Sequence, residues 1–409
     1  MTTQSQAISI QEISIQPGDI QETRPTKFGV IAAISFSHFL NDMMQSVLLA
    51  IYPILKLNLS LSFAQIGLIS FCFQVTGSLL QPLIGLYTDH KPKPYTLPFG
   101  MLLTMSGLLV LGRSTSFEMV LIAAMLIGMG SSIFHPESSR VARLAAGDRP
   151  GLSQSLFQVG GNLGGSIGPL LAAMIILPHG MASVAWFAAA ALIGAIVLSN
   201  VSYWYSQHLA SALHKGIKVV SSGFSRTQII GSLTVLGILM FSKFIYIASL
   251  TNYYTFFLIE KFHLSLHDAQ LYLFAFLLSS AAGTFLGGPI GDKIGRKKVI
   301  WWSILGVAPF TMMLPYANLH WTLVLSIIIG LVLSSAFSAI LVFAQELIPN
   351  RVGTISGLFF GLAFGIAGIA AALLGNLADV TSVQHVYRLC AFLPLLGIAA
   401  IFLPDIQKH

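Results

Sequence analysis

Five polar residues near the start of the chain follow helical spacing within an apolar stretch. They are Ser35, His38, Asn41, Asp42 and Gln45. Residues three and four apart share one face of a helix, so these side chains form a polar stripe. A carboxylate and an imidazole on such a stripe can exchange a proton. We therefore expect Asp42 to carry protons; the alternative is a structural carboxylate that holds His38 or a neighbouring helix.

A lysine takes the place of His38 in the second half of the chain. The sequence FSHF at 36–39 recurs as FSKF at 241–244, which aligns His38 with Lys243, and Tyr246 follows on the same helix face. Two nitrogen donors that face each other suit a doubly charged oxyanion such as a phosphate or phosphonate. We expect His38 and Lys243 to bind such an anion and Tyr246 to orient it. The alternative is that Lys243 pairs with Asp42.

The stretch from 152 to 178 carries a second polar face. Four residues at spacings of four form it: Gln154, Gln158, Asn162 and Ser166. Glycines among them permit the close approach of a neighbouring helix. Gln158 and Asn162 are predicted to be uncharged ligands of the anion, or else to form hydrogen bonds between helices. His135, near the end of another apolar stretch, is predicted to bind the anion or to shuttle protons, unless it only packs or caps its helix.

Charged residues gather where several apolar stretches end. Those predicted to form a cytoplasmic gate, with salt bridges between the halves, are Asp89, Glu137, Arg140, Asp292, Glu346 and Arg351. Asp89 and Asp292 each follow a glycine by four residues, and we expect both carboxylates to lie near helix N-termini. Glu137 is also a second candidate for proton coupling.

The elements that position these residues are twelve apolar stretches of about 20 residues or more, which is the length that a membrane-spanning helix needs. They cover 28–55, 64–88, 95–113, 117–139, 152–178, 183–204, 228–258, 266–290, 299–317, 321–346, 353–378 and 384–404. Of the 409 residues, 55% are hydrophobic and 9% are charged, against about 25% charged in an ordinary soluble domain. The chain is therefore predicted to be an all-α integral membrane protein in a lipid bilayer.

The basic residues set the orientation. Most of the 21 lysines and arginines fall in loops on one side of the twelve stretches, which predicts that both termini are cytoplasmic. The same cations are spread over short loops and form no basic groove, so we expect no nucleic-acid partner. The predicted organisation is a cytoplasmic tail (1–27), a six-helix bundle (28–204), a cytoplasmic linker (205–226), a second six-helix bundle (227–405) and a cytoplasmic C-terminus (406–409).

The sequences of the two predicted bundles are related by an internal repeat. Gly85 and Asp89 recur as Gly288 and Asp292, and SSIF at 131–134 recurs as SSAF at 334–337, both 203 residues later. A constant offset indicates duplication of one structural unit. Parallel repeats of this kind place a substrate site near the middle of the membrane, between the halves.

Longer motifs resemble the drug exporters of the major facilitator superfamily. They include SHFLNDMMQSVLLAIYPIL at 37–55, LFQVGGNLGGSIGPLLAA at 156–173 and GGPIGDKIGRKKVIW at 287–301, and the similarity covers nearly the whole chain beyond the N-terminal tail. The resemblance implies a monomeric carrier of the bacterial inner membrane that exports the phosphonate antibiotic fosmidomycin in exchange for protons, without a cofactor or metal. The copy of the third motif in the first half, at Gly85 and Asp89, departs from the family's pattern. Pro92 stands there at the position that Gly295 occupies in the second half.

Other functions remain open at this stage. The main alternative is a carrier that exchanges or imports an organophosphate or another small anionic metabolite, since exporters and importers share this fold and these residue types. An intramembrane enzyme is disfavoured because the sequence contains no HExxH motif. A passive channel would not need paired gate residues in both halves.

Overall fold

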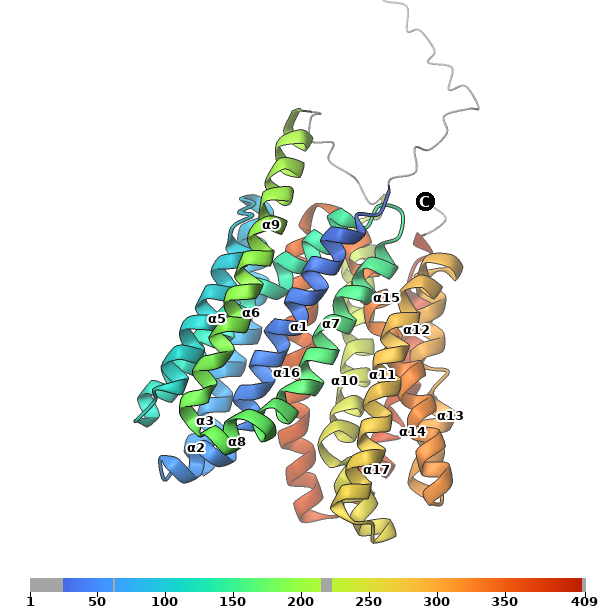
Figure 1. Ribbon diagram of the computed structural model, residues 1–409. Helices are drawn as coiled ribbons and strands as arrows, with labels where there is room; N and C mark the ends of the chain where they lie inside the picture. Colours follow the sequence, from blue (N-terminus) through green and yellow to red (C-terminus); the bar gives the residue numbers. More distant parts are fainter. Residues whose placement is uncertain (1–24, 62, 215–222, 407–409) are drawn as a thin grey trace, which may run out of the picture.

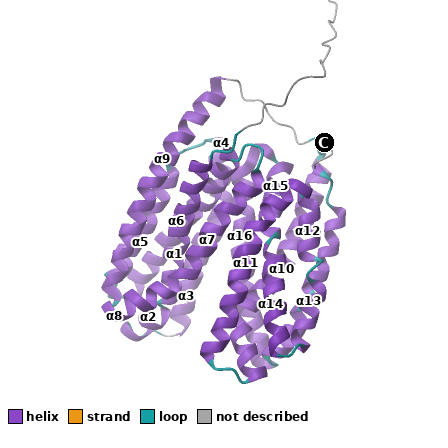
Figure 2. Ribbon diagram, turned by 45° about the vertical axis from the view of Figure 1, so that its right-hand side comes forward, coloured by secondary structure: helices purple, strands orange, loops and turns teal. Residues whose placement is uncertain are grey.

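The computed structural model describes residues 25–61, 63–214 and 223–406, and all regular structure in these ranges is helical (Figures 1 and 2). The first half contains α1 (Phe28–Ala50), α2 (Tyr52–Asn58), α3 (Phe63–Gln74), η1 (Val75–Leu79), α4 (Leu80–His90), α5 (Thr96–Gly112), α6 (Phe117–Ala145), α7 (Pro150–Leu171), η2 (Ala172–Ile176), α8 (Leu177–His179), η3 (Met181–Trp186) and α9 (Phe187–His214). The second half contains α10 (Arg226–Phe262), α11 (Leu266–Ile294), α12 (Arg296–Ile304), α13 (Ala308–Met313), η4 (Leu314–Tyr316), α14 (Leu319–Ser334), α15 (Ala336–Leu347), η5 (Pro349–Arg351), α16 (Val352–Val380), α17 (Val383–Cys390) and η6 (Leu393–Phe402).

The predicted all-α membrane fold is confirmed. Nine helical segments of the described chain are long and apolar enough to cross a membrane, and α5 is a shorter apolar helix. Two predicted stretches outside those nine, 28–55 and 152–178, form α1 and α7, which carry the polar faces. The element order is consistent with twelve spanning segments. Several of these are interrupted, by the break at Ile51 and by the π-helical turns η1 and η2.

The predicted boundaries between the halves can be compared only in part. The linker expected at 205–226 begins inside α9, which continues to His214, and α10 begins at Arg226. Residues 215–222 of the linker, 1–24 of the N-terminal tail and 407–409 of the C-terminus lie outside the described residues. The division into bundles at these exact positions therefore stays a prediction.

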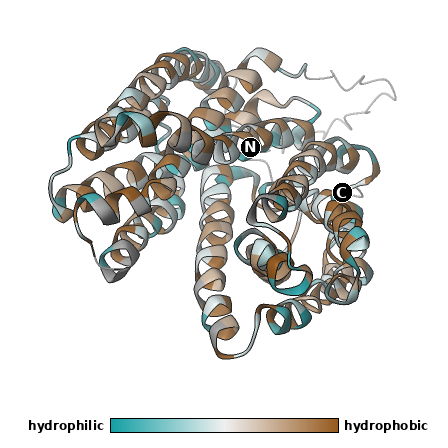
Figure 3. Ribbon diagram, turned by 60° about the horizontal axis from the view of Figure 1, so that its bottom comes forward, coloured by the Kyte–Doolittle hydropathy of each residue, from teal (hydrophilic) through white to brown (hydrophobic). Residues whose placement is uncertain are grey.

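Two groups of helices lie side by side, one from each half of the chain (Figure 1). They meet where α16 contacts α4 and α6, and where α7 contacts α11 and α15. Apolar residues run along most helices when the molecule is viewed from the end at which α2 lies (Figure 3). Large apolar side chains such as Phe71, Trp302 and Leu373 are exposed on the outer surface, as expected for a surface that contacts lipid rather than water.

Glycines bring α1 and α7 into close contact. A Cβ atom at any of four positions in α7 would overlap atoms of α1. The four are Gly160, Gly161, Gly164 and Gly168. The close approach predicted from the glycine spacing is confirmed, and it sets the polar stripe of α1 against the glycines of α7.

Candidate functional site

A cavity of about 580 Å³ lies between the two halves. Its walls come from α1, α7, α10 and α11, with Ser334 and Phe337 at one end. Four of the residues predicted from the sequence line it: Asp42, Gln158, Asn162 and Lys243. The Asn162 amide also donates to Thr284 Oγ1 of α11 at 3.4 Å. The cavity therefore brings together one carboxylate, one amine and two amides from opposite halves of the chain.

Lys243 is a buried cation without a carboxylate partner in the described part of the chain. Its side chain belongs to α10, and the residue is only 2% exposed. The Nζ atom lies 5.4 Å from the ring centroids of both Phe244 and Phe337. Such cation–π contacts compensate for only a small part of the hydration that an ammonium group loses on burial. An anion in the cavity would supply the missing counter-charge.

Asp42 pairs with two histidines and not with Lys243. The Oδ2 atom lies 3.2 Å from His38 Nε2, and Oδ1 lies 3.4 Å from His135 Nε2 of α6. The amides of Asn41 and Gln45 donate to Oδ1 at 3.0 and 3.3 Å. The alternative in which Asp42 neutralises Lys243 is therefore not the arrangement present in this conformation.

The histidine rings are fixed from behind by backbone carbonyl groups. His38 Nδ1 lies 2.7 Å from the carbonyl oxygen of Phe157, and His135 Nδ1 lies 3.0 Å from that of Ser131. The ligand atoms of His38, Asp42 and His135 lie within 4.8 Å of one another, a spacing that a metal ion could also bridge. We call these three residues the His–Asp cluster.

Three residues predicted to contact substrate do not line the cavity. His38, His135 and Tyr246 are each at most 1% exposed and lie behind its wall. Of the two nitrogen donors expected to face each other, only Lys243 reaches the cavity directly. Direct substrate contact by these three residues stays a prediction, and in this conformation His38 contacts Asp42 rather than the cavity.

An aromatic layer surrounds the His–Asp cluster, and sequence analysis did not anticipate it. The Phe157 ring stacks on His38 with centroids 4.1 Å apart, and Phe360 lies 5.2 Å from His135. Phe134 and Phe337 extend the layer. The internal repeat contained the signal, because Phe157 and Phe360 are 203 residues apart, as are Phe134 and Phe337.

Beyond the aromatic layer, a buried chain of hydrogen bonds joins four helices. Gln345 Nε2 of α15 donates to Ser139 Oγ at 3.2 Å and to Ser356 Oγ at 3.0 Å. Ser139 Oγ in turn donates to Gln154 Oε1 at 3.1 Å. The chain crosses between the halves through the bond from Gln345 to Ser139.

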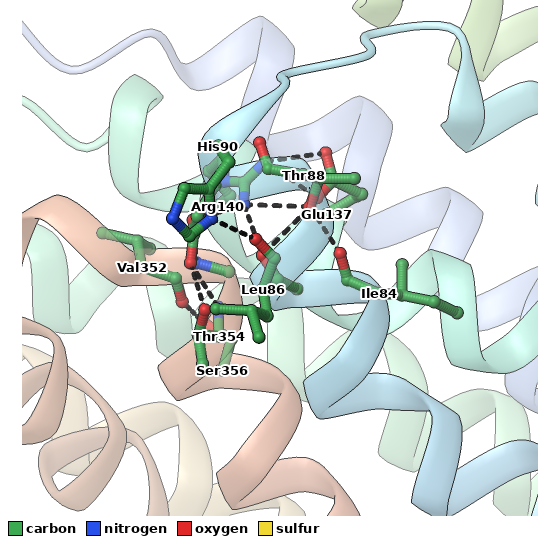
Figure 4. A network of polar contacts seen from close by, with 12 residues as sticks. Ile84, Leu86, Thr88, His90, Glu137, Arg140, Val352, Thr354 and Ser356 are labelled. Atoms are coloured by element: carbon green, nitrogen blue, oxygen red, sulfur yellow. Dashed lines mark hydrogen bonds and ion pairs between the residues drawn. The ribbon is translucent and has the colours of Figure 1, made fainter.

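The predicted gate residue Asp89 links the halves at the end of α4. Its carboxylate accepts the backbone N–H groups of Gly353 and Thr354 at 3.0 and 2.7 Å, which are in the first turn of α16. It also pairs with Arg140 of α6. Figure 4 shows this network, in which Arg140 and Thr354 lie on opposite sides of the junction. A carboxylate at a helix N-terminus is stabilised by the free N–H groups and the helix dipole.

Asp292 makes the equivalent link at the other junction. Its carboxylate, at the end of α11, accepts the N–H groups of Gly151 and Leu152 at 2.9 Å each, in the first turn of α7. Arg296 donates to the same carboxylate at 3.2 Å. Each half therefore caps a helix of the other half, in line with the repeat.

The remaining predicted gate residues divide into three kinds. Glu137 is buried within the first half, where it accepts from Thr88 and pairs with Arg140 at 2.8 Å. Glu346 pairs with Arg143 of the first half at 3.5 Å and with Arg296 at 3.1 Å, so it is the carboxylate that bridges the halves by ion pairs. Those two arginines were not predicted. Arg351 is exposed and forms no ion pair with any residue that the structure describes.

All of these links lie at one end of the molecule. The described residues nearest to both termini lie there as well, since Thr26 donates to Ala146 O and Lys297 donates to Leu403 O (Figure 1). The cavity lies on the other side of the aromatic layer. The structure is therefore closed at the end that carries the termini.

Comparisons with known proteins agree with this architecture. The model of the Major Facilitator Superfamily matches residues 34–259 and 236–409. The chain is 59% identical over 384 residues to the fosmidomycin resistance protein of Escherichia coli K12, covering 94% of both chains. It is 41% identical over 392 residues to the uncharacterized MFS-type transporter YfnC of Bacillus subtilis, covering 95% of this chain and 96% of that protein.

Solved structures share the fold. The fucose transporter FucP in the outward conformation superposes with a TM-score of 0.73 at 15% identity, covering 92% of this chain and 98% of that one. The human organic anion transporter MFSD10 gives a TM-score of 0.72 at 17% identity, covering 93% and 100%. The helical architecture, the family match over both halves and the 59% identity together identify the chain as a multi-pass membrane transporter of the major facilitator superfamily.

Proposed function

We propose that the protein exports fosmidomycin, or a similar phosphonate, across the bacterial inner membrane in exchange for protons. The observation that carries this proposal is Lys243, a buried ammonium group on the cavity wall with no carboxylate partner among the described residues. A phosphonate is a small oxyanion that would neutralise this cation. The relative at 59% identity carries the name fosmidomycin resistance protein, which supports this choice of anion.

The polar residues of α7 orient the substrate in this proposal. Gln158 and Asn162 lie on the cavity wall near Lys243, and their amides can donate to phosphonate or hydroxyl oxygens. Tyr246 and His135 act from behind the wall. The resulting site holds the anion mainly by charge and orients it by neutral hydrogen bonds.

Asp42 provides the route for protons. It is the carboxylate among the described residues that line the cavity, and its side chain is 20% exposed. We assign proton coupling to Asp42 rather than to Glu137, because Glu137 is occupied by Thr88 and Arg140 away from the cavity. Protons that enter from outside are exchanged for the drug that leaves.

Alternating access supplies the transport step. With both termini cytoplasmic, the closed end is the cytoplasmic end and the present conformation faces outward. Opening to the cytoplasm requires the links through Asp89, Asp292 and Glu346 to break. The carrier works as a monomer, since both halves of the cavity come from one chain.

The test uses energised inside-out vesicles and a pH-sensitive dye. Addition of fosmidomycin should release protons from wild-type vesicles, and Lys243→Ala should abolish this response while the protein still reaches the membrane. Lys91→Ala removes an exposed loop cation and is the matched control. An unchanged response in Lys243→Ala would refute the anion site. Drug binding without proton movement in the wild type would instead favour exchange against another anion, such as a phosphorylated metabolite.

A further inference from the structure

The acceptors behind the two histidines determine where their hydrogens are. A backbone carbonyl oxygen can only accept a hydrogen bond. His38 Nδ1 lies 2.7 Å from a carbonyl oxygen and therefore carries a hydrogen. His135 Nδ1 lies 3.0 Å from the Ser131 carbonyl oxygen and 3.2 Å from Ser131 Oγ; a hydrogen on this Nδ1 satisfies both contacts, because the hydroxyl oxygen can also accept. The proton that can come and go is therefore the one on each Nε2.

Both Nε2 atoms face the same carboxylate. They lie 3.2 and 3.4 Å from the two oxygens of Asp42. Both nitrogens are buried and neither forms a hydrogen bond in this conformation. If both rings were neutral, two Nε2 lone pairs would lie beside the carboxylate with no hydrogen between them. One added proton converts one of these contacts into a charge-assisted hydrogen bond and brings the cluster to zero net charge. A second added proton would leave a net positive charge in a buried site, which is costly.

The carboxylate itself is arranged to remain ionised. Its Oδ1 atom accepts from the amides of Asn41 and Gln45 as well as facing His135. Donors on one oxygen favour the charged form of a carboxyl group. Among the described residues that line the cavity, the other charged group is Lys243 of α10. The polar groups that α7 contributes to the wall are only amides and hydroxyl groups. Behind the wall, α16 contributes aromatic rings that pack against His135.

The three side chains of the His–Asp cluster differ in how far they are exposed. Asp42 is 20% exposed, whereas His38 and His135 are 1% and 0% exposed. A proton from the cavity therefore reaches Asp42 first and the ring nitrogens afterwards. The His135 ring also lies 5.2 and 5.5 Å from Phe360 and Phe364 of the opposite half. A charge on that ring thus arises at the interface that must move.

We propose that His38, Asp42 and His135 form one proton-binding site, in which an imidazole Nε2 holds the transported proton and Asp42 passes it between cavity and ring. The proton from the cavity binds to Asp42 and transfers to Nε2 to give an imidazolium; the reverse transfer releases it. This inference rests on the proposed proton exchange and names the atoms that carry it.

A glycine beside the cluster allows a test that keeps all three residues. A Cβ atom at Gly161 would lie 2.7 Å from Asp42 Oδ2 and would overlap His38 Nε2. Gly161→Ala should therefore separate the pair. Gly231→Ala, in α10, is the matched control, because that glycine is exposed and has nothing within 4 Å of the added methyl group.

The experiment compares two activities in proteoliposomes. Exchange of labelled for unlabelled fosmidomycin needs no net proton movement, whereas drug-driven proton flux does. We expect Gly161→Ala to retain drug exchange and to lose at least tenfold in proton flux, with Gly231→Ala unchanged in both. His135→Gln should lose proton flux by a similar factor. Histidine ¹⁵N spectra, assigned with His38→Gln and His135→Gln, should show both rings protonated at Nδ1.

The possible contrary results are distinct. Full proton flux in His135→Gln, or rings protonated at Nε2 alone, would overturn the site and leave the proposed exchange intact. Drug exchange without proton flux in the wild type would refute the proposed function and the site together. Loss of flux on addition of a chelator, with recovery on addition of Zn²⁺, would show that the cluster binds a metal ion instead.

Discussion

Replacement of Asp89 by asparagine should shift the protein towards the conformation that opens at the terminus-bearing end. The carboxylate accepts two N–H groups across the junction, from the first turn of α16, and pairs with Arg140 of its own half. Asparagine retains one acceptor oxygen but loses the charge, and its amide group must face a donor. The substitution therefore removes the part of each contact that depends on the negative charge.

The size of the effect follows from the contacts that are lost. A hydrogen bond to a charged group contributes about 1.5–3 kcal/mol. If two such contacts are lost at the low end of this range, the closed end is destabilised by about 3 kcal/mol. Since about 1.4 kcal/mol corresponds to a tenfold change in an equilibrium constant, the ratio of closed to open molecules should fall by about 100-fold.

Spin labels at exposed positions in each half measure this shift directly. Labels at Lys91 and Lys293, in a background without Cys72 and Cys390, lie at the ends of α4 and α11. Pulsed electron–electron distance measurements should show a new population of longer distances in Asp89→Asn. Asp268→Asn, at the opposite end of α11, is the control. An unchanged distance distribution in Asp89→Asn would refute the view that this cap holds the halves together.

Three further predictions follow from the packing and from the cavity wall. Gly160→Ala should lower the melting temperature in detergent by several degrees, because a Cβ atom there would overlap Ser35 O of α1; equal melting temperatures would contradict the packing argument. Gln345→Leu removes two neutral hydrogen bonds of about 1 kcal/mol each, so it should open the same end by less than Asp89→Asn does, as measured with the same labels. The apolar part of the wall, which includes Phe274 and Leu277, should favour longer n-alkylphosphonates as competitors of fosmidomycin binding. Each added CH₂ should improve competition about fourfold, at about 0.8 kcal/mol per group, and no dependence on chain length would exclude this wall as a binding surface.

Helical periodicity predicted three of the polar residues that line the cavity, although it also pointed to His38 and Tyr246, which lie behind the wall. Asp42, Gln158 and Asn162 lie on polar faces of otherwise apolar helices, and such faces turn away from lipid. Lys243 followed from the repeat and from the cost of a cation in a membrane. These arguments depend on one helix at a time, which is why a single sequence supports them.

The pairing of Asp42 with His38 on one helix was an alternative that the spacing offered, but the pairs between residues of different helices could not be predicted. His135 comes from α6 and meets Asp42 only because glycines bring α1 against α7 and thereby fix the position of α1. Glu346 likewise bridges Arg143 and Arg296, which are far apart in the sequence. Spacing along one helix does not reveal the rotation of its neighbour.

The uncompensated ammonium group of Lys243 has an electrical consequence. The carrier returns without drug but with a proton on the His–Asp cluster. This proton neutralises the cluster and leaves the positive charge of Lys243, which moves from contact with the outside to contact with the cytoplasm, so the reset step is electrogenic. A full elementary charge gains about 2.3 kcal/mol for each 100 mV of membrane potential. The inside-negative voltage of a bacterial cell therefore drives the drug-free, protonated carrier back to its starting position, and depolarisation should slow turnover even when the pH gradient is maintained.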